Sequence, residues 1–205
     1  MKKHLTIWFA LVICFFLPLL ICSFIGWKNK PASSLPFYGD GTAVNVSFEM
    51  KDQSERIVTE KEWKNRIVVA NFFFTHCPVV CPKMTNHLKL VAGNFENNQE
   101  IIFQSFTVDP ERDDVTRLKQ YAIKNSIDES QWQLVTGSKK EIYDLARKNF
   151  KVTVAEGNGG NEDFIHTDKL VLLDRQQRIR GYYPGTDPLS VKQLINDIKT
   201  LENEN

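Results

Sequence analysis

The sequence has no excess charge of either sign, and this absence excludes one large class of partners. Its 205 residues contain 26 Lys and Arg side chains and 25 Asp and Glu side chains. Only Lys2 and Lys3 precede residue 28, so the rest of the chain carries 24 basic and 25 acidic side chains. Binding of nucleic acid requires a concentrated basic surface that faces the phosphates. We therefore expect no nucleic-acid partner.

Cysteine is scarce, and the patterns that are missing exclude several kinds of thiol site. The chain has four cysteines, at positions 14, 22, 77 and 81. No second pair accompanies Cys77 and Cys81 to complete a structural zinc site, and no histidine follows Cys81 as in the C-x-x-C-H motif of haem attachment. Three residues separate Cys77 from Cys81, whereas the familiar thiol oxidoreductase motif C-x-x-C has two.

Charge is absent from residues 5–27, the long hydrophobic run of the sequence. At ~1.5 Å rise per residue, a helix of this length exceeds the ~30 Å hydrocarbon core of a bilayer. No small-residue cleavage site of the A-x-A kind ends the run, so we predict an uncleaved transmembrane anchor over residues 1–27. Cys14 and Cys22 are expected to be apolar thiols of this span, because the residues before Cys22 lack the small residue typical of lipoprotein processing.

The charges that flank the anchor do not set its orientation. Lys2 and Lys3 before the span are balanced by Lys28 and Lys30 after it. Because the anchor stands at the start of the chain, with the remainder following like cargo behind a signal sequence, we expect that remainder on the extracytoplasmic (periplasmic) side. The protein is thus predicted to be a single-pass membrane protein.

Strand and helix patterns alternate after a polar linker at residues 28–36 and predict one α/β domain over residues 37–205. The expected strands cover residues 43–50, part of 52–63, 66–74, 100–108, 132–137, 168–174 and 178–185. The expected helices begin near Pro82 and cover residues 113–126, 138–150 and 187–204. Residues 66–74 are almost wholly apolar and predict a central strand covered on both faces. This order predicts a mixed sheet flanked by helices, a domain of the thioredoxin kind.

The two cysteines follow directly after the predicted central strand, within T-H-C-P-V-V-C-P. Each precedes a proline, which disfavours helical backbone, so both are expected to be extended, with Pro82 at the first helical position. A helix N-terminus beside them favours the thiolate, which is both a nucleophile and a soft metal ligand. The pair alone is compatible with a disulfide staple, a redox couple or a metal site.

A third ligand would favour the metal site, and histidine is also scarce. His4 lies at the membrane edge, and His87 is expected to be a solvated helix residue. Strand alternation is expected to direct His76 away from Cys77. His166 ends a Gly- and Asn-rich segment, residues 154–164, and precedes a strand expected to neighbour the cysteine strand.

Proline is absent between Pro110 and Pro184, so this segment lacks the cis-proline that thioredoxin-like oxidoreductases present to their dithiol. Two thiolates and the His166 imidazole would suit copper, because soft thiolates select Cu(I) and imidazole also accepts Cu(II). A surface histidine in a loop remains the alternative.

Five segments of the chain resemble the Sco/SenC family of membrane-anchored copper chaperones from about Phe48 to the C-terminus. They are N-F-F-F-T-H-C-P-V-V-C-P-K-M, T-V-D-P-E-R-D-D, W-Q-L-V-T-G, D-F-I-H-T-D-K-L-V-L-L-D and G-Y-Y-P-G. The resemblance implies a thioredoxin-like fold in which Cys77, Cys81 and His166 bind copper. Asp109 of D-P-E-R-D could lie near the metal, although we expect an aspartate that forms a turn before Pro110.

The resemblance further implies a role in assembling the binuclear copper centre of cytochrome c oxidase, with its copper-binding subunit as partner. A copper donor or a thioredoxin-like reductant is a further expected partner. The alternative is an anchored thiol–disulfide oxidoreductase in which Cys77 and Cys81 form a redox dithiol that reduces the cysteines of a partner copper site. A peroxidase-like thiol enzyme is weaker, because no peroxide-activating arginine stands near the pair. Insertion of metal requires reduced thiols, so one protein could serve as both chaperone and reductase.

Overall fold

Two fully buried parallel strands form the centre of the sheet. In the computed structural model, which describes residues 17, 34–152 and 167–204, every residue of β3 (Ile67–Phe73) and of β4 (Ile101–Thr107) is buried. Their near-continuous apolar sequences suit strands that have helices on both faces. The central strand predicted from residues 66–74 is thereby confirmed to within one residue at each end.

The remaining elements follow the predicted order. The other strands are β1 (Glu49–Asp52), β2 (Ile57–Thr59), β5 (Trp132–Thr136), β6 (Lys169–Leu173) and β7 (Ile179–Pro184). The helices are η1 (Glu60–Trp63), α2 (Val80–Gly93), α3 (Val115–Asn125), α4 (Lys139–Asp144), η2 (Leu145–Asn149) and α5 (Pro188–Asn203), of which η1 is a 3-10 turn and η2 a π turn. Pro188 opens α5, as predicted.

The seven strands form one mixed sheet in the order β2-β1-β5-β4-β3-β6-β7. Strands β3, β4 and β5 are parallel, whereas β6 pairs antiparallel with β3 and β1 pairs antiparallel with β5. The α/β architecture and the position of β6 beside the cysteine strand both agree with the sequence prediction.

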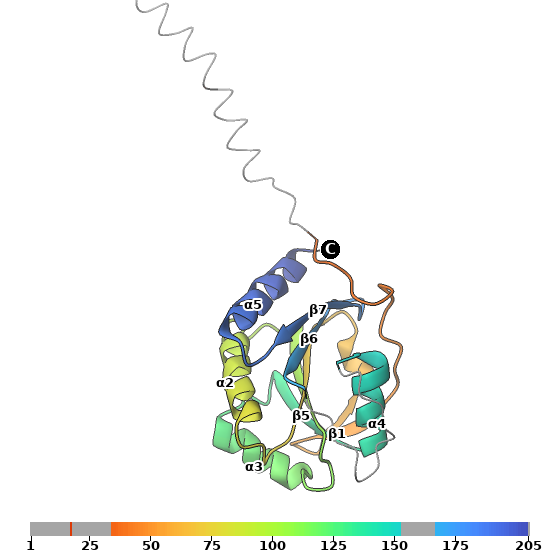
Figure 1. Cartoon of the computed structure of the whole chain (residues 1–205), viewed down its shortest axis with the longest axis vertical. Coiled ribbons are helices and arrows are strands. Elements are labelled where there is room, and N and C mark those ends of the chain that lie inside the picture. The colour runs from red at the N-terminus through yellow and green to blue at the C-terminus, as the bar shows by residue number, and fades with distance from the viewer. Residues whose placement is uncertain (1–16, 18–33, 153–166, 205) are drawn as a thin grey trace, which may run out of the picture. The chain divides into compact units, whose positions relative to one another are not determined.

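Two apolar layers cover the sheet (Figure 1). Helices α2, α3 and α5 pack on one face around Met84, Leu118 and Leu194, and α4 and η2 pack on the other face around Tyr143 and Phe150. Burial of an unpaired polar group is costly, and buried polar side chains of the sheet are accordingly hydrogen-bonded to one another, such as Trp132 Nε1 to Ser105 Oγ at 2.9 Å.

The strand predicted over residues 43–50 is largely wrong, because β1 begins only at Glu49. Between residue 34 and β1, the described chain forms an isolated bridge from Ala43 to Arg178. The alternation that predicted the strand is real, since Val44, Val46 and Phe48 all pack against the α4 face of the sheet. An extended segment that packs through alternate side chains needs no partner strand to show this pattern.

No helix within residues 17, 34–152 and 167–204 combines the length and the apolar character needed to cross a bilayer. The predicted anchor lies outside the described residues, with the exception of Leu17. The chain divides into two units, Met1–Ser33 and Ser34–Asn205, and the fold described here is that of the second.

A buried arginine fixes the first described residues of this unit to its C-terminal helix. Arg180 is 2% exposed and forms ion pairs with Asp174 at 3.1 Å and Glu204 at 2.7 Å. Its guanidinium also donates to the carbonyl of Leu35 at 2.6 Å, and the Leu35 N–H donates to Glu204 Oε1 at 2.9 Å. Arg175 connects the same end of α5 to Glu100, the residue before β4. Both ends of the described unit therefore lie at the end of the sheet at which the central strands β3 and β4 begin.

A close approach at Gly185, just after β7, gives a stability prediction. A Cβ there would lie 2.8 Å from Met84 Cγ and 3.0 Å from the Asp168 carbonyl oxygen. Gly185→Ala is therefore expected to lower the free energy of unfolding by ~1–3 kcal/mol, measured by urea denaturation. Gly93→Ala is the control, because its Cβ would meet only Glu96 Oε1 at 3.9 Å, and this change is expected to be neutral or stabilising. An equal effect of the two substitutions would refute the close packing.

Candidate metal centre

The two cysteines lie at the junction between β3 and α2. Cys77 lies in the loop after β3 and is half-buried, and its N–H donates to the Phe74 carbonyl at 3.4 Å. Cys81 lies in the first turn of α2 and is 4% exposed. The prediction that both cysteines are extended, with Pro82 at the first helical position, is wrong for Cys81. Helix α2 begins at Val80, and Pro82 is tolerated in its first turn because N–H groups there have no partner within the helix.

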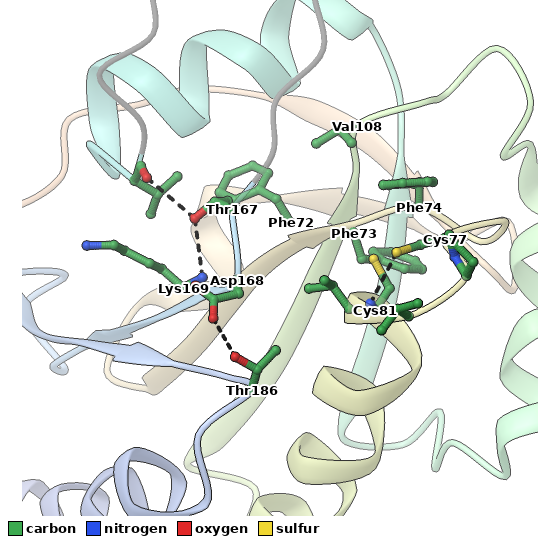
Figure 2. Close-up of a pocket in the computed structure, with 14 residues that line it drawn as sticks. Phe72, Phe73, Phe74, Cys77, Cys81, Val108, Thr167, Asp168, Lys169 and Thr186 are labelled. Carbon is green, nitrogen blue, oxygen red and sulfur yellow. Dashed lines mark hydrogen bonds between the residues drawn. The ribbon is translucent and has the colours of Figure 1, made fainter.

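A hydrogen bond at the start of this helix connects the two cysteines. Both cysteines are free thiols, and the Cys81 N–H donates to Cys77 Sγ at 3.3 Å (Figure 2). The bond resembles the capture of an anion by a helix N-terminus, because Cys77 presents its sulfur to N–H groups that the helix leaves unpaired.

Cys77 is the thiol that ionises more readily. Burial opposes its ionisation, but hydrogen bonds from the N–H groups of Cys81, Val79 and Val80 and from the Cys81 thiol outweigh burial and lower the pKa of Cys77 below its ordinary value. A thiolate at this position is therefore favoured by the same donors that start α2.

Cys81 has the opposite character. Burial, together with its hydrogen bond to Cys77 and the nearby negative charges of Cys77 and Asp113, raises the pKa of Cys81 to about 12. The pair thus consists of one accessible thiol that ionises easily and one buried thiol that resists ionisation.

This asymmetry predicts unequal alkylation. With a pKa of about 12, roughly one Cys81 thiol in 10⁴ is ionised at pH 8, so iodoacetamide should label Cys77 much faster than Cys81. The rate at Cys77 should also reach its plateau at a lower pH than the rate at an ordinary cysteine, because its pKa is lowered. Mass spectrometry of the peptides gives each rate separately, and equal rates at the two positions would contradict the assignment.

A cavity of about 620 Å³ opens beside the pair. Figure 2 shows Cys77 and Cys81 on one side of it and Thr167, Asp168 and Thr186 on the other. The wall beside the cysteines is otherwise apolar, with Phe73 and Val108 among its residues. Asp168 brings a carboxylate to the opposite wall, where it accepts a hydrogen bond from Thr186 Oγ1 at 2.6 Å.

The sheet register explains why the segment before β6 reaches this cavity. In the antiparallel pair of β3 and β6, Leu170 lies opposite Asn71, so residues that precede β6 approach the end of β3, where the cysteine loop begins. Val152 and Thr167 both line the cavity, and Thr167 Oγ1 donates to the Val152 carbonyl at 3.4 Å. The two described residues on either side of the gap, Val152 and Thr167, therefore both lie at the rim of the cysteine cavity.

The predicted third ligand, His166, lies outside the described residues, as does His4. Within the described ranges, which end at Val152 and resume at Thr167, no three His, Cys, Asp or Glu side chains form a group able to hold a metal ion. Cys77 and Cys81 are accordingly the two predicted ligands that the structure brings together.

The other two histidines are engaged elsewhere. His76 is exposed, its Nε2 lies 3.5 Å from Asp109 Oδ2, and its ring contacts that of Phe74. His87 was predicted to be solvated, and this is wrong: it is half-buried, and its Nδ1 lies 2.7 Å from the Gly185 carbonyl oxygen. Neither histidine is among the described residues that line the cavity.

Asp109 forms a turn, as expected. Its carbonyl accepts from the N–H groups of Arg112 at 3.1 Å and Asp113 at 2.9 Å, and its carboxylate faces His76 and Arg112. Asp113, the last residue of D-P-E-R-D, is a further residue beside the cysteine loop that the sequence patterns do not indicate: it is fully buried and accepts a hydrogen bond from the Thr75 N–H. No local pattern in the sequence marks this role, because acidic residues are common in loops and the burial of Asp113 arises from tertiary contacts.

Comparisons with known proteins agree with the fold and identify the family. The family described as SCO1/SenC matches residues 38–203. The chain is 30% identical to an SCO2-like protein of Rickettsia typhi over an alignment of 178 residues. The alignment covers 84% of each of the two chains. The chain is 27% identical to BsSco, a protein of solved structure. BsSco is described as a member of the Sco family of cytochrome c oxidase assembly proteins, and a disulfide switch was identified in it. It superposes with a TM-score of 0.69 and covers 83% of this chain and 99% of BsSco.

A copper-bound structure has the same fold. ScoI of Bradyrhizobium japonicum, solved with copper bound, superposes with a TM-score of 0.60 over 77% of this chain and 98% of ScoI. Its 24% identity supports similarity of fold.

Proposed function

The chain belongs to the SCO1/SenC family, and from this premise we propose that it is a copper chaperone whose cargo is held by Cys77, Cys81 and His166. One observation supports the proposal above the others: two reduced thiols in contact line a cavity whose rim also includes Thr167, the residue that follows His166. Thr167 is the first described residue after the Gly- and Asn-rich segment that ends in His166, so the proposal rests on this sequence neighbourhood.

The donors fit copper chemically. Two thiolates are soft ligands that favour Cu(I), and addition of an imidazole gives a set that also accepts Cu(II). Cys77, with its lowered pKa, is the thiol expected to meet the incoming ion first. Cys81 then loses its proton as the second sulfur binds, because coordination of a metal overcomes the cost of burying a thiolate.

We propose that the acceptor is the copper-binding subunit of cytochrome c oxidase, in which the chaperone helps to assemble the binuclear copper centre. Support comes from the description of BsSco as a cytochrome c oxidase assembly protein and from the copper bound to ScoI. A copper donor or a thioredoxin-like reductant would reload or reduce the site. The single-pass anchor proposed for residues 1–27 would keep the copper domain at the membrane surface, on the extracytoplasmic side.

A second function is favoured by the unequal thiols. A half-buried cysteine of lowered pKa beside a buried one of raised pKa is the arrangement of a nucleophilic and a resolving thiol, so the pair could reduce a disulfide of a partner copper site. In such a cycle the Cys77 thiolate attacks the partner's disulfide, and Cys81 then displaces the partner and leaves a Cys77–Cys81 disulfide. Both roles need the same reduced pair.

Spectroscopy of the full-length protein in detergent tests the copper proposal. Addition of one equivalent of Cu(II) to the reduced protein is expected to produce sulfur-to-copper charge-transfer absorption and an EPR signal that shows nitrogen coupling. Reduction of the ion should bleach both signals while one copper stays bound. Absence of charge-transfer absorption would leave the thiol reductase as the better proposal.

A further inference from the structure

Asp113 is a buried carboxylate that accepts hydrogen bonds from the neutral groups of two threonines. It is fully buried, and its Oδ1 accepts from Thr75 Oγ1 at 2.6 Å. Its Oδ2 accepts from the Thr75 N–H at 2.9 Å and from Thr107 Oγ1 at 2.6 Å. Burial of a charge is costly unless hydrogen bonds satisfy it, so three short bonds to one carboxylate indicate a tightly fixed group.

These bonds connect the end of β4 to the cysteine loop. Thr107 is the last residue of β4, and Thr75 stands two residues before Cys77. Thr107 Oγ1 also accepts from the Asp109 N–H at 3.1 Å, and Arg117 Nε donates to Thr75 Oγ1 at 3.2 Å. The contacts converge on Thr75 and fix where the loop leaves β3.

Different parts of the fold hold the two cysteines. Cys81 belongs to α2 and packs in the core beside Met84 and Phe73. Cys77 packs only at the edge of that core and depends on Thr75 on one side and on the Cys81 N–H on the other. Loss of the Asp113 bonds should therefore displace Cys77 and leave Cys81 in place.

We propose that Asp113 is a positioning residue that sets the separation of the two thiols by holding Thr75. An acid is required, because all three partners point donors at it, whereas an amide would present its own N–H donors to them. This role deepens the proposed function, since copper capture depends on the same separation, but the test below uses no copper and therefore stands apart from the copper assignment.

The test is the equilibrium of the dithiol with glutathione. Oxidised glutathione accepts two electrons and two protons from the Cys77 and Cys81 thiols, which yields one Cys77–Cys81 disulfide and two reduced glutathione molecules. The equilibrium constant measures how effectively one thiol meets the other. The full-length protein is used with Cys14 and Cys22 replaced by serine, and mass spectrometry quantifies the disulfide.

Asp113→Asn is expected to lower this constant about tenfold, which corresponds to ~30 mV for a two-electron couple. Thr75→Val should lower it at least about threefold, because it removes the hydroxyl donor but keeps the N–H bond. Thr75→Ser restores the hydroxyl and should stay within about twofold of the wild type. A merely structural effect of the Thr75 methyl group would instead impair the serine variant.

Asp114→Asn is the matched control. Asp114 is the exposed neighbour that caps α3 by accepting from the Arg117 N–H at 2.7 Å, and asparagine caps helices equally well. The glutathione equilibrium constant of Asp114→Asn should equal that of the wild type. If Asp113→Asn fails to fold, as judged by near-UV circular dichroism, the Thr75→Val and Thr75→Ser variants test the proposal in its place. A Thr75→Val constant within twofold of the wild type, or a Thr75→Ser constant as low as that of valine, would overturn the proposal.

Discussion

Replacement of Cys77 by serine is expected to lower the affinity of the protein for Cu(I) by on the order of 10³ or more, and Cys81→Ser should do the same. The hydroxyl oxygen of serine is a hard ligand that stays protonated, so each variant would keep one thiolate and lose the two-sulfur clamp. The effect should exceed the 10–100-fold losses typical of residues that only support a ligand.

Competition against a chromophoric Cu(I) chelator measures this affinity. The control is the Cys14→Ser, Cys22→Ser double variant, which removes the two thiols of the predicted anchor and should bind copper like the wild type. A one-to-one Cu(I) complex that persists in Cys77→Ser with unchanged affinity would remove the cysteine pair from the site and favour the thiol reductase.

The second large effect is expected from His166→Ala. Without the imidazole, Cu(II) affinity should fall by on the order of 100-fold or more, whereas Cu(I) should lose less because two thiolates can hold it alone. The glutathione equilibrium of Cys77 and Cys81 should stay within about twofold of the wild type, since the histidine takes no part in forming the disulfide. This combination separates a metal ligand from a residue that supports the dithiol.

His76→Ala is the matched control, because His76 follows β3 beside the cysteines yet its imidazole faces Asp109. The EPR signal of the Cu(II) complex of His76→Ala should keep the nitrogen coupling. The same coupling should disappear in the Cu(II) complex of His166→Ala. If the coupling survives in His166→Ala and disappears in His76→Ala, the proposed ligand set is wrong at its third position.

Much of the fold could be predicted because its signals are local. The buried strands β3 and β4 are almost wholly apolar, and α5 opens with Asp187 as a side-chain cap followed by Pro188. These patterns predict the order of elements, and the rule that ligands lie at the carboxyl ends of parallel strands predicts a site after β3.

Other features depend on tertiary context, which a single sequence does not display. Cys81 is helical despite the proline that follows it, because packing of α2 on the sheet outweighs the local preference of one residue. Asp113 acquires its role only when β4 brings it beside Thr75, 38 residues earlier in the chain. The segment that contains His166 is identified by its position before β6, whereas its geometry is outside the described residues.

The anchoring of Leu35 by Arg180 has a practical consequence for handling the protein. Leu35 and Glu204 meet at the edge where β3 and β4 begin, and Cys77 follows the opposite end of β3, a strand of 7 residues at ~3.3 Å each. A fusion partner, an affinity tag or a sensor surface joined at either terminus of residues 34–204 would thus stand about 20 Å or more from the sulfur atoms. Cys77, the accessible thiol of the pair, would remain open to reagents and to other proteins at the opposite end of the domain.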